Sequence, residues 1–319
     1  MDLTLPEEYL VHINEVSDML ALNQQVANEE YFSRRHINRS IDEEIRTNPD
    51  SESRVKHGVK LLEDWLKGDY YKQKNARLVQ INTSLLEEIV RDVFISVAYC
   101  TQAELYVSVT AQLANRMGFD SHRDSIITIA EICAVLCHTD AFHIYKEDTF
   151  TSLMIVNRLP LSADLLAKIE RSFYVPPMIC PPLPVESNYE SAHLSFNDSV
   201  VLGQGNNHNE DLCLDVINTQ NNIALTLDID FLSQVPEEPT HVIDTQEKLH
   251  QWDLFKHQSN EIYQMLHDQG NKFWLTNKVD KRGRLYCMGY HVTAQGSPFK
   301  KAMLELATTE LVEGVPNND

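Results

Sequence analysis

The chain has 319 residues, 43% of them hydrophobic and 8% aromatic, which is enough for roughly two or three domains with folded cores. Its 27 Lys and Arg against 47 Asp and Glu give a formal charge of −20, which argues against a generally basic nucleic-acid-binding protein and leaves only local basic patches for that role. No run approaches the ~20 apolar residues of a membrane span, and the acidic first residues lack the parts of a signal peptide. We therefore expect a cytosolic protein whose six scattered cysteines are reduced.

Helices are predicted for most of the first 140 residues. Apolar residues recur at helical spacing over 6–30, and after a break at 48–51 another helix runs to Gly68. A long helix is expected over about 83–117 and a further one over about 124–138. The segment 29–60 is rich in Arg and Lys, which fits either a surface facing nucleic acid or an ordinary solvated helix face. Residues 1–140 are thus predicted to form a helical N-terminal domain.

A second region, 141–236, begins where the pattern changes. Apolar residues on both sides of a polar tip predict a hairpin over 141–157. A short helix over 162–172, with Ser162 as its N-cap, precedes a Pro-rich stretch at 176–184 that must be extended. A strand over 193–202 and a helix over 211–232 complete this region.

The last two regions are predicted to be a thumb-like helical segment at 237–270 and a mixed segment at 271–319. The first contains a charged amphipathic helix over about 245–268, which ends before Gly270. The second contains short strands at 272–277 and 284–291 and a helix from Ser297 to about Thr308. The predicted fold class is therefore mainly α with small β elements.

The most informative motif is the run Asp280-Lys281-Arg282-Gly283-Arg284-Leu285-Tyr286, followed by Gln295-Gly296 and Lys301. Two arginines separated by a glycine allow a tight turn from which both guanidinium groups reach one target, and arginine suits bidentate contact with phosphate. The Arg-Gly-Arg turn alone is also explained by a surface hairpin with ordinary charges.

In combination, these residues resemble the start of the palm in single-subunit RNA polymerases, the phage and mitochondrial enzymes. A second block, Pro177-Met178-Ile179-Cys180-Pro181-Pro182-Leu183-Pro184, closely resembles a Pro-rich block of the same family, although Val185 stands where the family has Trp. A third block, 215–221, resembles more loosely a helix that precedes the family's thumb. The resemblance covers roughly residues 140–310.

The resemblance implies specific roles. Arg284 would hold the template backbone, Arg282 and Asp280 would brace the turn, and Lys301 would place charge near the template–RNA hybrid. The further nucleic-acid contacts implied are Arg282, Lys281 and Lys300, and the supporting residues are Gly283, Tyr286, Gln295 and Gly296. By its position along the chain, the predicted hairpin corresponds to a strand-separating hairpin of the family, with the tip Lys146, Glu147, Asp148 and Thr149; a plain structural hairpin fits equally well.

No residue of this chain is predicted to be catalytic or to bind a metal. In the family, the carboxylates that hold Mg²⁺ lie beyond the Gln-Gly helix, so the metal is expected on a partner chain that carries the catalytic palm and fingers. Asp228 and Asp230 are interpreted as surface carboxylates. A zinc site at Cys133, Cys137, His138 and His143 lacks a second cysteine pair, so buried thiols are the preferred interpretation.

As a whole, the chain is similar to the smaller, N-terminal-side subunit of the two-chain RNA polymerases of enquatrovirus-like phages (Schitoviridae). This implies a DNA-directed RNA polymerase that is active only as a complex in the cytoplasm of a bacterial host. Its partners would be the catalytic subunit, template DNA and nascent RNA, and the resemblance leaves open whether a helper protein opens the promoter. The alternative is a non-catalytic nucleic-acid-binding or regulatory protein derived from the front half of a polymerase.

Overall fold

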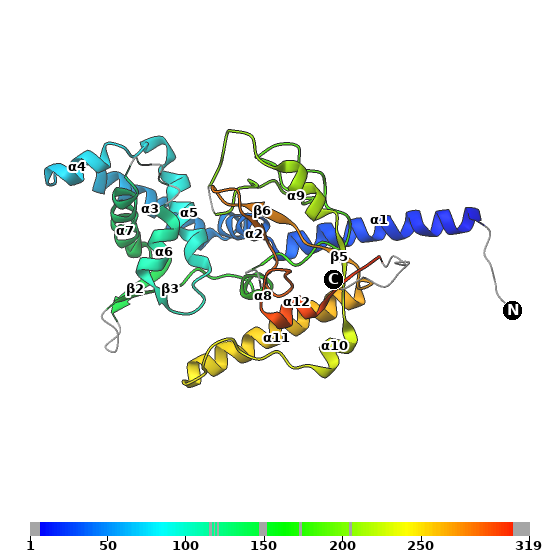
Figure 1. Cartoon of the computed structure of the whole chain (residues 1–319). Helices are drawn as coiled ribbons and strands as arrows, with labels where there is room; N and C mark the ends of the chain where they lie inside the picture. The colour runs from blue at the N-terminus through cyan, green and yellow to red at the C-terminus, as the bar shows by residue number, and fades with distance from the viewer. Residues whose placement is uncertain are drawn as a thin grey trace. The chain divides into compact units, whose positions relative to one another are not determined.

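The protein is described by a computed structural model that covers residues 7–114, 117, 119, 121–146, 152–171, 174–203 and 206–308. Within these residues it is mainly helical with small antiparallel sheets, as the sequence predicts (Figure 1). The chain divides into two compact units. We call Arg34–Phe173 the helical unit, and Met1–Ser33 together with Tyr174–Asp319 the discontinuous unit. The domain boundaries predicted at 140, 236 and 270 stay a prediction.

The helical unit is built from short helices around one core. Helix α2 shows why they pack: Ile37, Ile41 and Ile45 recur every four residues and are all buried. Asn48 caps the next helix by accepting hydrogen bonds from two backbone amides of its first turn. The helices are α2 (Arg34–Thr47), α3 (Pro49–Leu66), α4 (Lys72–Leu78), η1 (Thr83–Leu85), α5 (Leu86–Ala98), α6 (Tyr106–Ala114), α7 (His122–Leu136), η2 (Cys137–Thr139) and α8 (Ala163–Arg171).

A three-stranded antiparallel sheet completes this unit and corrects one prediction. Strands β2 (Phe142–Lys146) and β3 (Leu153–Asn157) pair as the predicted hairpin, with Ile144 opposite Ile155. Strand β1 (Glu104–Leu105) pairs with the other edge of β3. The helix predicted over 83–117 is therefore wrong, because the chain leaves the helical path after α5 to form β1 before α6 begins.

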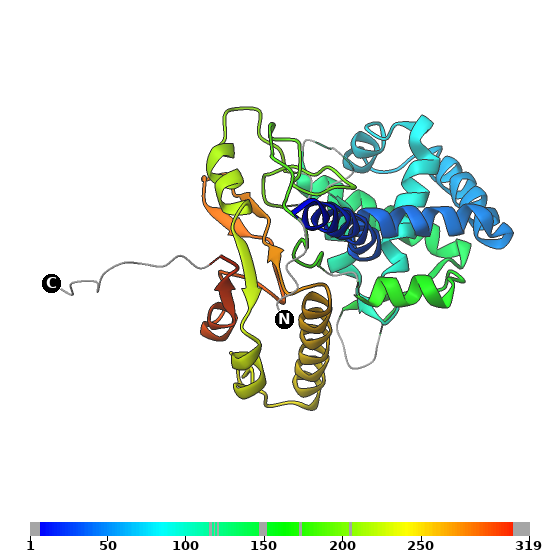
Figure 2. The same ribbon diagram turned by 90° about the vertical axis from the view of Figure 1, so that its right-hand side faces the viewer.

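The discontinuous unit combines the long N-terminal helix α1 with the helices and strands that follow residue 174. Figure 2 shows α10 and α11 next to each other, with β4 leading into α10. The strands β5, β4 and β8 form one antiparallel sheet in that order, and β6 and β7 form a separate hairpin. The elements are α1 (Glu7–Phe32), α9 (Leu214–Asn221), β4 (Ala224–Leu227), α10 (Ile229–Gln234), α11 (Gln246–Asp268), β5 (Phe273–Trp274), β6 (Asn277–Val279), β7 (Leu285–Cys287), α12 (Pro298–Ala302) and β8 (Leu304–Leu306).

Three predictions for this unit are wrong. The helix expected over 211–232 is interrupted by β4, and the final helix ends at Ala302 so that residues 304–306 form β8. Both changes have one cause, since β8 and β5 pair with opposite edges of β4 and supply its hydrogen bonds. The strand expected over 193–202 is reduced to a single bridge between Val201 and Val279.

Candidate nucleic-acid interface

The Arg-Gly-Arg motif forms the tight turn that joins β6 to β7. The backbone amide of Asp280 donates to the carbonyl of Arg284 at 2.9 Å, and the amide of Gly283 donates to the carbonyl of Asp280 at 2.9 Å. Gly283 has φ +77°, a left-handed conformation that only glycine adopts without strain. The glycine is therefore required by the turn that presents the two arginines.

The carboxylate of Asp280 organises the whole turn. One oxygen accepts from the amides of Arg282 and Arg284 at 2.9 and 3.0 Å. The other accepts from Nε of Arg284 at 2.7 Å and from the hydroxyl of Tyr286 at 3.4 Å. Desolvation opposes ionisation, but the hydrogen bonds from Arg284 prevail and lower the pKa of Asp280. Asp280 thus stays charged and braces the turn.

Arg284 is fixed in direction and yet accessible. Its guanidinium pairs with Asp280 at 2.6 Å and lies 5.6 Å from the centre of the Tyr286 ring, while about half of its side chain, 54%, is exposed. The hydrogen bond to Asp280 raises the pKa of Arg284. A guanidinium has five N–H donors, so donors remain for an external phosphate. Arg282 and Lys281 are exposed on the same turn and add positive charge beside it.

Gln295 and Gly296 join this turn to α12. The side-chain oxygen of Gln295 accepts from the amide of Cys287 at 2.9 Å, and its nitrogen donates to the carbonyl of Leu285 at 3.1 Å, so Gln295 pairs with the free edge of β7. A side chain at Gly296 would meet Cβ of Lys300 at 2.8 Å. The amide of Gln295 thus supplies both a donor and an acceptor to β7, and Gly296 leaves room for the side chain of Lys300.

The two lysines of α12 lie in different environments. Lys301 is exposed, as a contact to nucleic acid requires. Lys300 is only 4% exposed, and its amine donates to the hydroxyl of Tyr263, the carbonyl of His291 and the carboxylate of Glu237. Neighbouring residues of a helix point about 100° apart, so one of the pair faces inward. The prediction that Lys300 is a direct nucleic-acid contact is therefore corrected.

Within the discontinuous unit, hydrogen bonds join two of the three sequence blocks that carry the resemblance to residues near the other blocks. Asn218 of the third block makes two hydrogen bonds with the backbone of Val185, directly after the Pro-rich block, at 2.8 and 2.9 Å. Asn221 of the same block accepts from the amide of Asn277 in β6 at 2.8 Å. Met178 exchanges two backbone hydrogen bonds with Trp274 in β5. The sequence did not predict these pairings, since each joins segments at least 33 residues apart.

The remaining predicted residues lie away from the arginine turn in the sequence or outside the residues that the structure describes. Lys146 is exposed at the end of β2, whereas Glu147, Asp148 and Thr149 are outside the described residues. Asp228 caps α10 by accepting from the amide of Phe231 at 2.8 Å.

The described residues contain no group of three or more His, Cys, Asp or Glu side chains that could hold a metal ion. Cys133, in the candidate zinc motif, is buried, and burial raises the pKa of its thiol to about 12.

A comparison with the profiles of known protein families finds no match to this chain, and a search of curated proteins finds none. No helix among the described residues is long and apolar enough to cross a membrane.

Proposed function

We propose that this chain is the N-terminal-side subunit of a split single-subunit DNA-directed RNA polymerase. The observation that supports this most is that the third block is hydrogen-bonded to Val185, next to the Pro-rich block, and to Asn277 of β6, the strand that pairs with β7 across the arginine turn. A chance likeness in one block would not require the others to lie beside it. The roles below rest on this proposal.

In this proposal, Arg284 binds a phosphate of the template strand and Asp280 holds its guanidinium in place. Arg282, Lys281 and Lys301 contribute positive charge toward the template–RNA hybrid. A second chain supplies the carboxylates that bind Mg²⁺ and the site for the incoming nucleotide. The complex adds ribonucleotides to the RNA 3′ end under direction of the template and releases pyrophosphate, and this chain alone is inactive.

The phosphate contact is tested by the salt dependence of binding. The full chain is titrated against a fluorescent RNA–DNA hybrid at several salt concentrations. Log affinity falls as log salt rises. Removal of one phosphate contact by Arg284→Ala makes this slope less steep by about one. The fold is retained, because the side chain is half exposed and its partner Asp280 keeps two backbone donors.

The matched control is Lys67→Ala, which removes an exposed lysine, paired with Asp64, from the end of α3 in the helical unit. It leaves the slope unchanged. Wild-type binding that does not vary with salt, or an Arg284→Ala slope equal to that of the wild type, would remove Arg284 from the proposed site.

A further inference from the structure

Lys300 is a buried cation whose hydrogen-bonding capacity is fully used. An ammonium group has three N–H donors. Here they meet the Tyr263 hydroxyl at 2.6 Å, the His291 carbonyl at 2.7 Å and the Glu237 carboxylate at 3.2 Å. The side chains of Lys300 and Glu237 are only 5% and 12% exposed. No donor of Lys300 is left for an external phosphate.

The three acceptors come from three different segments of the discontinuous unit. Glu237 lies in the connection between α10 and α11, residues 235–245, which Figure 1 shows running alongside α11. Tyr263 belongs to α11, and His291 to the loop between β7 and α12. Phe299, directly before Lys300 in α12, packs against Phe231 of α10 with ring centres 5.3 Å apart. Helix α12 therefore contacts α10, the α10–α11 connection and α11.

The α10–α11 connection has little apolar packing of its own. Val235 is 40% exposed and Val242 is 77% exposed. A cavity of about 630 Å³ opens between α10 and α11, and Glu237 and Tyr263 are among the residues that line it. The ion pair between Glu237 and Lys300 joins this connection to α12 beside that cavity.

We infer that Lys300 is a positioning residue, which holds the α10–α11 connection and α11 against α12 and the loop that carries His291. A buried ion pair adds little net stability compared with an apolar pair of the same size, but loss of one partner leaves the other charge buried and unpaired. The neighbouring Gln295 pairs with β7, so the same short stretch of chain ties α11 to the strand that follows the arginine turn.

Hydrogen exchange on the full chain tests this role without reference to function. Lys300→Met keeps an unbranched side chain, one atom shorter, and removes the three donors. Amides of residues 249–260 then exchange roughly tenfold faster or more, because α11 and the connection lose a common anchor. Lys301→Met changes the exposed neighbour and leaves exchange unaltered. Equal exchange in Lys300→Met and wild type would overturn the inference.

A second pair of variants covers the case in which Lys300→Met does not fold. Glu237→Gln removes the charge from the connection but keeps its shape, and Glu238→Gln is the exposed control next to it. The inference requires the amides of residues 249–260 to exchange faster than wild type in Glu237→Gln and at the wild-type rate in Glu238→Gln. Identical exchange in the two variants would contradict it.

A binding measurement, which rests on the proposed function, separates positioning from direct contact. Lys300→Met weakens binding of the RNA–DNA hybrid several-fold with the salt slope unchanged, whereas loss of a phosphate contact lowers the slope by about one. A lowered slope would make Lys300 a direct contact after all. If wild-type binding does not vary with salt, the proposed phosphate contact of Arg284 fails, and the exchange result still decides the role of Lys300.

Discussion

Glu29 shows how one residue can hold a long helix to the rest of its unit. Its side chain is fully buried on α1. The carboxylate accepts from the amides of Leu194 and Ser195 at 3.0 and 2.7 Å, from the Ser195 hydroxyl at 2.6 Å and from Gln25 at 2.9 Å. Burial opposes ionisation, but His193, Ser195 and the other donors prevail and lower the pKa of Glu29 to about 2.

The variant Glu29→Gln should therefore destabilise the protein by roughly 2–3 kcal/mol, because an amide nitrogen replaces an acceptor that faces several donors. Chemical denaturation of the variant measures this loss. Glu30→Gln, an exposed neighbour on the same helix, is the control and should change stability by less than about 0.5 kcal/mol. Equal stabilities for the two variants would refute the anchoring role.

The pH dependence of stability has a definite sign for Glu29. Its pKa is lower in the folded protein than its usual 4.5, so the stabilisation is complete above pH 4.5 and is lost as the pH falls toward 2. Glu29→Gln should remove this part of the acid sensitivity.

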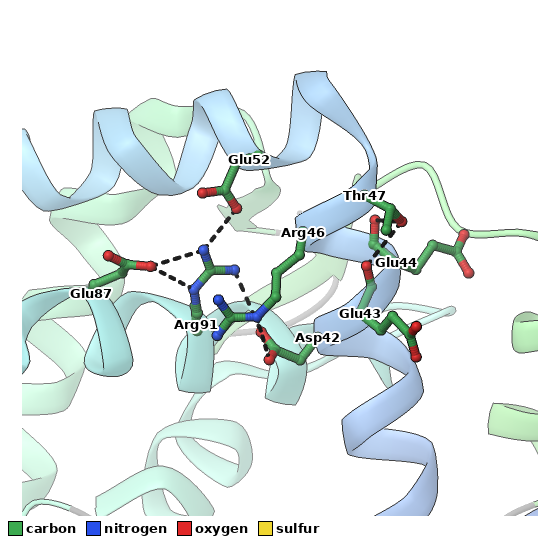
Figure 3. A network of polar contacts seen from close by, with 8 residues as sticks. All are labelled: Asp42, Glu43, Glu44, Arg46, Thr47, Glu52, Glu87 and Arg91. Carbon is green, nitrogen blue, oxygen red and sulfur yellow. Dashed lines mark hydrogen bonds and ion pairs between the residues drawn. The ribbon is translucent and has the colours of Figure 1, made fainter.

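At the scale of elements, the helical unit is joined by a network of charges around Arg91 (Figure 3). Arg91 of α5 is buried and pairs with Glu52 of α3 at 2.7 Å, with Glu87 at 2.9 Å and with Asp42 of α2 at 3.4 Å. Asp42 also accepts from Arg46 at 2.8 Å. One guanidinium thus connects three helices.

Arg91→Met should cost about 2–4 kcal/mol in thermal or chemical unfolding, because it leaves three carboxylates close together without their shared cation. Arg46→Met removes a mostly exposed arginine from the same network and should cost no more than about 1 kcal/mol. The two variants give the same loss only if the network contributes nothing beyond surface ion pairs.

The sequence predicts some of these elements and misses others. Helices with clear local signals appear near their predicted positions, as α1, α7 and α11 do. The strand β4 escaped prediction because its apolar residues also fit a continuing helix, and its state is decided by β5 and β8, which are distant in sequence. The turn at Gly283 was predicted from local residues, whereas the burial of Lys300 depends on Glu237 and Tyr263, which no local pattern links to it.

At the scale of the whole molecule, the charge of −20 limits where nucleic acid can bind. An acidic surface repels phosphates, so we propose that nucleic acid contacts the basic turn that carries Arg282 and Arg284. The carboxylates needed to bind Mg²⁺ belong, in our proposal, to another chain. The proposed function therefore requires a partner chain.

The most direct test is to purify this chain from its native host and measure the intact mass and subunit sequences of the complex. We expect a second subunit in equal amount, with the metal-binding carboxylates and the nucleotide site, and template-directed RNA synthesis by the complex. Recovery of the chain alone, or with a protein that lacks these features and makes no RNA, would rule out the split polymerase and favour a regulatory protein derived from a polymerase.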